Sequence, residues 1–153
     1  MLVASLIVAV TGPSLAQQWQ ARYDAVYHAF RSNQPKAFAA FFSRDYVYVG
    51  PSERAISRND FLRFNQRTMA TLKDAKGKIL LVKVSLDGFE AKADFVWDYQ
   101  FSLAHETHLH GRELGTDTWR FGSDGWHVRH SHDSRNDVGG QRGNLAGPTR
   151  AQY

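Results

Sequence analysis

The sequence has no cysteine, and only four prolines and two methionines among its 153 residues. Without cysteine the chain can form no disulfide, no thiolate metal site and no thiol nucleophile. Any chemistry must therefore use imidazole, phenol, carboxylate or guanidinium groups. Net charge is also low, since +4 spread over a whole domain produces a weak field. The 42% apolar and 13% aromatic content excludes a disordered chain and can form the core of one domain.

The two ends of the chain differ in composition from its centre. Residues 2–10 are apolar except for Ser5, and the small residues Ser14 and Ala16 then provide a site for signal peptidase. We therefore expect residues 1–16 to be a signal peptide, and the mature chain to be periplasmic or secreted. The alternative is a buried N-terminal strand or helix. The apolar run is too short to span a bilayer as a helix, so no stable membrane span is expected.

The other end, residues 135–153, is rich in glycine and carries three arginines against one aspartate. This composition predicts a flexible tail. Half of the net positive charge lies in this tail, which leaves the central domain, residues 17–134, with only +2. Because this domain has no basic stripe interleaved with exposed aromatic residues, nucleic acid is not an expected partner.

The first half of the central domain has helical periodicity. Apolar residues recur at helical spacing within residues 17–33, and Pro35 can begin a second helix that carries Phe38, Phe41 and Phe42. Residues 46–49 form a short β run. Ser57 has the spacing of an N-cap for a third helix, which we expect to end near Gly77.

The second half alternates with a period of two, which predicts strands over residues 80–86, 89–103, 108–121 and 126–133. Leu80, Val82, Val84 and Leu86 would share one face of the first strand. Asp87-Gly88 is a strong two-residue hairpin signal. The fold class is therefore α+β, with three N-terminal helices packed on a curved antiparallel sheet.

Several segments carry a family resemblance: residues 41–51, 57–61, 117–119 and 126–134. In the last of these, Trp126 is followed by His130, His132 and Ser134. They resemble the nuclear transport factor 2-like superfamily, in particular SnoaL-like domains of the secreted bacterial type. The last strand is similar to the association domain of calcium/calmodulin-dependent kinase II. This resemblance implies a cone with an internal pocket over residues 17–134, and a homodimer formed through the outer face of the sheet.

The last strand supplies the candidate catalytic residue. If Trp126 and Val128 face the core, strict alternation also turns His130 and His132 into the pocket. Imidazole titrates near neutral pH, so His130 is a candidate general acid or base and both histidines are candidate ligand-binding residues. Alternatively, the two histidines plug the mouth of the cone or lie in an interface.

Four further residues are candidates for ligand binding. Trp97 and Tyr99 lie on the apolar face of the long strand, where they would line a pocket or simply fill the core. Tyr48 fits the pocket mouth and core packing equally well. Arg112 would bind a carboxylate inside the cone, or else pair with Glu90 or Asp94 on the outer face.

A metal site is not predicted, although His105, His108 and His110 cluster at one turn, because a solvated turn explains them better. No cofactor motif is present. The ketosteroid isomerase set, an Asp base with a Tyr and a protonated Asp, is also not expected, since the apolar face of residues 89–103 carries no acid. The sequence thus favours a domain that binds a small molecule, with isomerase- or cyclase-type chemistry at His130 as one interpretation. The alternative is a non-enzymatic assembly module.

Overall fold

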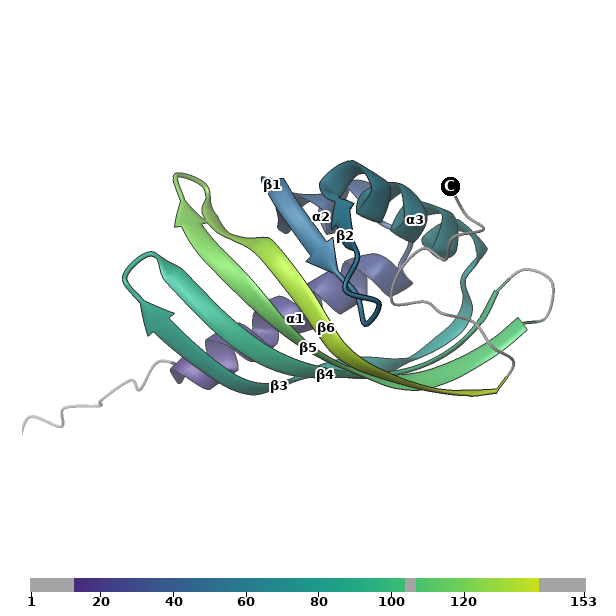
Figure 1. The fold of residues 1–153 in the computed structure, drawn as a ribbon. Coiled ribbons are helices and arrows are strands. Elements are labelled where there is room, and N and C mark those ends of the chain that lie inside the picture. The colour runs from purple at the N-terminus through teal and green to yellow at the C-terminus, as the bar shows by residue number, and fades with distance from the viewer. Residues whose placement is uncertain (1–12, 104–106, 141–153) are drawn as a thin grey trace, which may run out of the picture.

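The computed structural model describes residues 13–103 and 107–140. These residues form three helices and six strands, and the helices lie in the first half of the chain (Figure 1). The α+β class predicted from the sequence is confirmed. In chain order the elements are α1 (Leu15–Arg31), α2 (Pro35–Ala40), β1 (Phe42–Val49), β2 (Ala55–Ser57), α3 (Arg58–Thr71), β3 (Lys73–Asp87), β4 (Glu90–Leu103), β5 (Thr107–Gly122) and β6 (Gly125–Gly140).

The six strands form one sheet in the order β2-β1-β6-β5-β4-β3. Neighbouring strands are antiparallel except for β1 and β6, which run parallel. The sheet is curved, and the helices lie on its concave side (Figure 1). The short strand β2, which pairs with β1, was not predicted. No helix in the described part of the chain is long and apolar enough to span a membrane.

Local capping explains where two of the helices begin. Ser14 caps α1 through a reciprocal capping box with Gln17, and Ser57 accepts a hydrogen bond from the Asp60 backbone N–H at the start of α3. The start of α3 agrees with the sequence prediction. Helix α1 begins at Leu15 and so runs through the expected cleavage site after Ala16. Residues 1–12 lie outside the described residues, so cleavage and secretion stay predictions.

Two helix ends differ from the prediction. Helix α2 ends at Ala40, so Phe42 belongs to β1 instead. Helix α3 ends at Thr71, and the expectation that it continues to Gly77 is wrong. Gly77 lies in β3 with a φ of 133°, where a Cβ atom would collide with the backbone carbonyl oxygen of Asp98. The glycine at this position therefore permits close strand pairing.

The face of β3 that contacts the core was also predicted wrongly. Ile79 and Leu81 pack against the core, whereas Leu80 and Val82 are exposed. The register then slips, because Leu81 pairs with Phe95 but Lys83 pairs with Asp94. This bulge at Val82 returns Val84 to the core side and breaks the simple alternation.

A second bulge, at Arg129 in β6, decides which side chains face the concave side. Val128 pairs with Trp119, yet His130 pairs with Thr118, so Arg129 is the extra residue. Because an extra residue reverses the alternation, Val128, Ser131 and Asp133 all line the concave side. Strand β6 also continues to Gly140, so residues 135–140 belong to the sheet and not to a tail; residues 141–153 lie outside the described residues.

The core on the concave side is dominated by aromatic rings packed edge to face. Trp19 of α1 contacts Trp119 of β5 with ring centroids 5.3 Å apart, and Tyr23 contacts the same indole at 5.8 Å. The Trp119 side chain is fully buried. These rings attach α1 to the middle of the sheet and hold Tyr23 beside β5.

Gly115 of β5 allows two other side chains to approach the strand. A Cβ atom at this position would collide with the Phe95 ring and with a carboxyl oxygen of Asp133. We expect Gly115→Ala to lower the free energy of unfolding by about 1–3 kcal/mol, as measured by urea denaturation. The control is Gly122→Ala, where the nearest atom is 3.6 Å away and a Cβ fits. Equal stability of the two variants would contradict this account of the packing.

Candidate functional site

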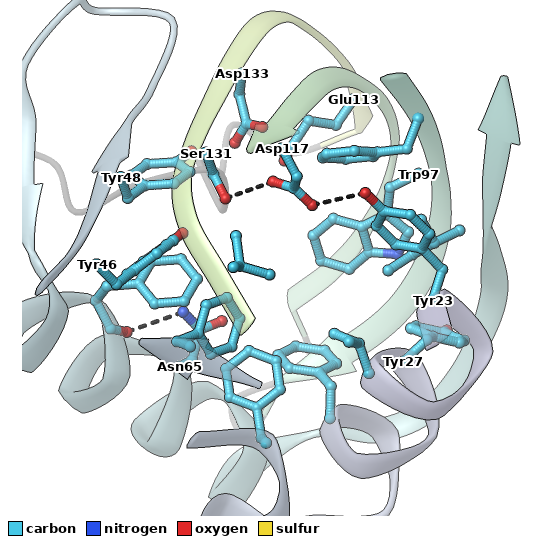
Figure 2. Close-up of a pocket in the computed structure, with 18 of the residues that line it drawn as sticks. Tyr23, Tyr27, Tyr46, Tyr48, Asn65, Trp97, Glu113, Asp117, Ser131 and Asp133 are labelled. Atoms are coloured by element: carbon cyan, nitrogen blue, oxygen red, sulfur yellow. Dashed lines mark hydrogen bonds between the residues drawn. The ribbon is translucent and has the colours of Figure 1, made fainter. Parts of the chain in front are cut away.

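A cavity of about 100 Å³ lies between the helices and the concave face of the sheet. Most of its lining residues are aromatic, and they come from all three helices and from five of the strands. Figure 2 shows Tyr46 and Tyr48 of β1 on one side of this cavity, with Tyr23 and Tyr27 of α1 on the opposite side. Packing of these elements thus creates a space with largely apolar walls.

Three carboxyl groups line this cavity. Glu113 and Asp117 belong to β5 and Asp133 to β6, and their exposed fractions are 4%, 6% and 1%. Alternation along β5 places Glu113 and Asp117 on the same face as Trp119. The bulge at Arg129 brings Asp133 to that face from the neighbouring strand.

Asp117 is held by two hydroxyl groups. Its carboxylate accepts a hydrogen bond from the Tyr23 hydroxyl at 2.9 Å and another from the Ser131 hydroxyl at 2.5 Å (Figure 2). The Trp119 indole N–H in turn donates to the Tyr23 oxygen at 3.2 Å. Burial raises the pKa of Asp117 to about 7, and the two hydrogen bonds limit that rise.

Glu113 and Asp133 form an interacting pair of carboxyl groups. Burial raises the pKa of Glu113 well above its usual range, and the nearby charge of Asp133 raises it further. Burial also raises the pKa of Asp133, opposed by hydrogen bonding with Glu113 and Tyr48. Two buried carboxyls at close range cannot easily both ionise, so such a pair retains a proton near neutral pH.

Several polar atoms in the cavity wall are buried without a hydrogen-bond partner among the described residues. They include Oε2 of Glu113, the Tyr27 and Tyr46 hydroxyls and Nε1 of Trp97. Leaving such a group unpaired in the interior costs about 1–3 kcal/mol. These groups can therefore gain free energy by binding a polar group placed in the cavity.

The arrangement is suited to acid–base chemistry. A protonated carboxyl can donate a proton, and its ionised partner can accept one. Among the described residues, no group of three or more His, Asp and Glu side chains is arranged so that it could hold a metal ion. His105 lies outside the described residues.

Two of the predicted ligand-binding residues line the cavity. Tyr48 is buried, and Trp97 lies half-buried in the wall. Tyr99 is not among the lining residues; it is buried in an adjacent cluster with Phe101 and Leu109, and its ring centroid lies 4.7 Å from that of Trp97. The apolar face of the long strand was therefore predicted correctly, but Tyr99 packs beside Trp97 and does not line the cavity.

The two histidines of β6 do not face the cavity, so that prediction is wrong. The bulge at Arg129 moves His130 and His132 to the opposite side of the strand, in register with Val47 and Val49 of β1. His132 Nε2 lies 3.3 Å from a carboxylate oxygen of Glu53. A role for His130 as the acid or base inside the cone is therefore excluded by its position.

Other predicted polar residues also lie on the outer face. Arg112 donates two hydrogen bonds to Asp98, at 2.6 and 3.1 Å, rather than pointing into the cone. The outer-face alternative was right, although the partner is neither Glu90 nor Asp94. His108 and His110 share this face of β5, where His108 Nδ1 lies 2.8 Å from the Ser102 hydroxyl.

The three cavity carboxylates were not recognised in the sequence. One signal was available: Glu113 and Asp117 have the same strand parity as Leu109 and Trp119, so two acids fall on an apolar face. Asp133 gave no such signal, because its direction depends on the bulge. The expectation that residues 89–103 supply no acid holds, yet the neighbouring strands supply three.

The curved sheet, the helices on its concave side and the cavity between them define an α+β cone domain. Residues 20–136 match the family model of the SnoaL-like domain, and the chain belongs to this family. Comparison with curated proteins finds no match.

Several solved structures share the fold that this resemblance implies. A nuclear transport factor 2-like protein from Cytophaga hutchinsonii is similar with a TM-score of 0.64 and 8% identity, over 80% of this chain and 98% of that one. A candidate calcium/calmodulin-dependent protein kinase II association domain from Xanthomonas campestris has a TM-score of 0.63 and 15% identity, over 87% and 96%. A ketosteroid isomerase-like protein from Erwinia carotovora atroseptica has a TM-score of 0.60 and 16% identity, over 74% and 89%. At these identities the likeness establishes the fold alone.

The raised pKa of Asp117 makes the stability of the protein depend on pH. Between the unfolded pKa near 3.9 and the folded value of about 7, the native state binds more protons than the unfolded state, so stability falls as pH rises. From pH 5 to pH 8, Asp117 alone should lower the free energy of unfolding by about 2–3 kcal/mol. We expect urea denaturation to show that the free energy of unfolding of Asp117→Asn falls less between pH 5 and pH 8 than that of the wild type, by that amount.

The control for this experiment is Asp98→Asn. Hydrogen bonding from Arg112 holds the pKa of Asp98 below its usual range, so this surface carboxylate does not titrate between pH 5 and pH 8. The pH dependence of this variant should equal that of the wild type. An unchanged slope in Asp117→Asn would show that the Asp117 carboxyl is ionised throughout.

Proposed function

We propose that this SnoaL-like domain binds a small molecule with an apolar ring in the aromatic cavity and transfers protons to and from it. The observation that carries the proposal is the Glu113 and Asp133 pair, two interacting carboxyls buried in the wall of an otherwise apolar space. One carboxylate of the pair would accept a proton from a carbon next to a carbonyl group. The protonated partner would donate a hydrogen bond to the carbonyl oxygen.

Asp117 and the tyrosines support this assignment in different ways. Both oxygens of Asp117 already accept hydrogen bonds, so it would position Tyr23 and Ser131 rather than contact the ligand. The Tyr46 hydroxyl and Oε2 of Glu113 have no partner among the described residues and are available to the ligand. The division of roles would leave the carboxyl pair as the reacting groups.

The alternative of a non-enzymatic assembly module depends on the outer face of the sheet. Leu80 and Val82 are exposed on the outer side of β3, which is consistent with a contact to a second copy. This observation concerns a different surface and does not explain carboxyls buried in a cavity. The homodimer therefore stays a prediction, and light scattering of the purified protein decides it.

Cyclohexanone tests both binding and proton transfer with one probe. In D2O, the wild type should bind it saturably and speed the exchange of its α hydrogens, followed by NMR. Asp133→Asn should bind it within about 3-fold of wild type but lose about 100-fold of the exchange rate, because the amide cannot accept the proton. An exchange rate equal to that of wild type would remove Asp133 from the reaction.

Cavity-filling variants test where the probe binds. Val26 lines the cavity from α1, so Val26→Phe should abolish binding. Ile79→Phe fills the cavity from β3 and is the substitute if Val26→Phe fails to fold. The matched control is Val82→Phe on the exposed side of β3. Equal binding by the filled and control variants would place the binding site outside the cavity.

A further inference from the structure

The polar groups in the cavity wall are strongly biased toward negative charge. Three carboxyls line the cavity, whereas no lysine, arginine or histidine is among its lining residues in the described part of the chain. Positive charge acts on the site only from outside: His132, on the other face of β6, lowers the pKa of Asp133, and Arg31 lowers that of Tyr27. The protein thus provides acids here without supplying a buried cation to pair with them.

The unpartnered atoms in the wall include an acceptor suited to a cation. Oε2 of Glu113 is buried and has no hydrogen-bond partner among the described residues. The Tyr46 hydroxyl is likewise buried without a partner and can accept a hydrogen bond through its oxygen. A ligand group with several N–H donors would satisfy both atoms.

The apolar walls favour the same kind of ligand group. The rings of Tyr27, Phe30 and Trp97 lie next to one another, with centroids 6.4 Å apart for Tyr27 and Trp97 and 5.8 Å apart for Phe30 and Trp97. Faces of aromatic rings attract ammonium groups, and more strongly when the cation is desolvated. The same rings can pack against an apolar ligand ring, so the walls suit an organic amine rather than a hydrated metal ion.

We propose that the preferred ligand is a small organic cation, an ammonium group on an apolar ring, whose charge is held by Glu113 and Asp133 and whose ring packs against the aromatic walls. This rests on the proposed function, because it names the ligand class of the same cavity. A neutral ligand leaves the two acids to share protons. A bound ammonium instead compensates their charge, which removes most of the cost of ionising them in the interior.

Three ring-matched probes test the charge preference: cyclohexylammonium chloride, cyclohexanol and sodium cyclohexanecarboxylate. An alkyl ammonium resembles the lysine side chain, with a pKa near 10.4, and is charged at pH 7.5. Isothermal titration of the full chain at pH 7.5 should show at least 10-fold tighter binding of cyclohexylammonium than of cyclohexanol. The carboxylate should not bind saturably.

Two variants connect the preference to the carboxyl pair. Glu113→Gln should bring the affinity for cyclohexylammonium to within about 3-fold of that for cyclohexanol. Asp133→Asn should act in the same direction and replaces Glu113→Gln if that variant fails to fold. The control Asp98→Asn also removes an acid, but on the outer face, and should retain the full preference.

The outcomes separate this inference from the function on which it rests. Binding of cyclohexanol or cyclohexanecarboxylate as tightly as cyclohexylammonium would overturn the amine preference while leaving the cavity as a ligand site. A preference that survives both Glu113→Gln and Asp133→Asn would also overturn it, since the charge would then act elsewhere. If none of the probes, cyclohexanone included, binds the wild type, the proposed function fails as well.

Discussion

Burial of three carboxyl groups in one aromatic-walled space is the constraint on which the rest of the site depends. Removing a carboxylate from water disfavours its ionised form, and no cationic side chain in the cavity wall of the described chain opposes that effect. Asp117 is stabilised by hydroxyl donors from α1 and β6, while Glu113 and Asp133 interact with each other. The protein therefore holds three carboxyl groups with raised pKa values in the wall of one cavity.

The backbone of β6 provides the geometry for this burial. One extra residue, Arg129, turns Ser131 and Asp133 toward the cavity and His130 and His132 away from it. Without the bulge, the same sequence would place two histidines in the cone and leave Asp117 without its donor from Ser131. A single irregularity in strand pairing thus determines whether β6 presents imidazoles or a carboxyl to the cavity.

Much of the fold could be predicted from the sequence, because helical spacing in residues 17–33 and alternation in residues 89–103 extend over many positions. The side chains of the site were harder to predict from the sequence. Bulges at Val82 and Arg129 each reverse the faces of the residues that follow, and such slips depend on partner strands rather than on local sequence. Tyr48 and Trp97 line the cavity, which is one of the two interpretations that the sequence left open for each. Asp133, beyond a bulge, could not be placed.

A pH titration of the carboxyl carbons by ¹³C NMR tests the central claim most directly. The resonances of Glu113, Asp117 and Asp133 can be assigned from the Glu113→Gln, Asp117→Asn and Asp133→Asn variants. The account predicts a midpoint near pH 7 for Asp117, and midpoints above the ordinary carboxyl range for the Glu113 and Asp133 pair. Ordinary midpoints near pH 4 for all three carboxyls would contradict it.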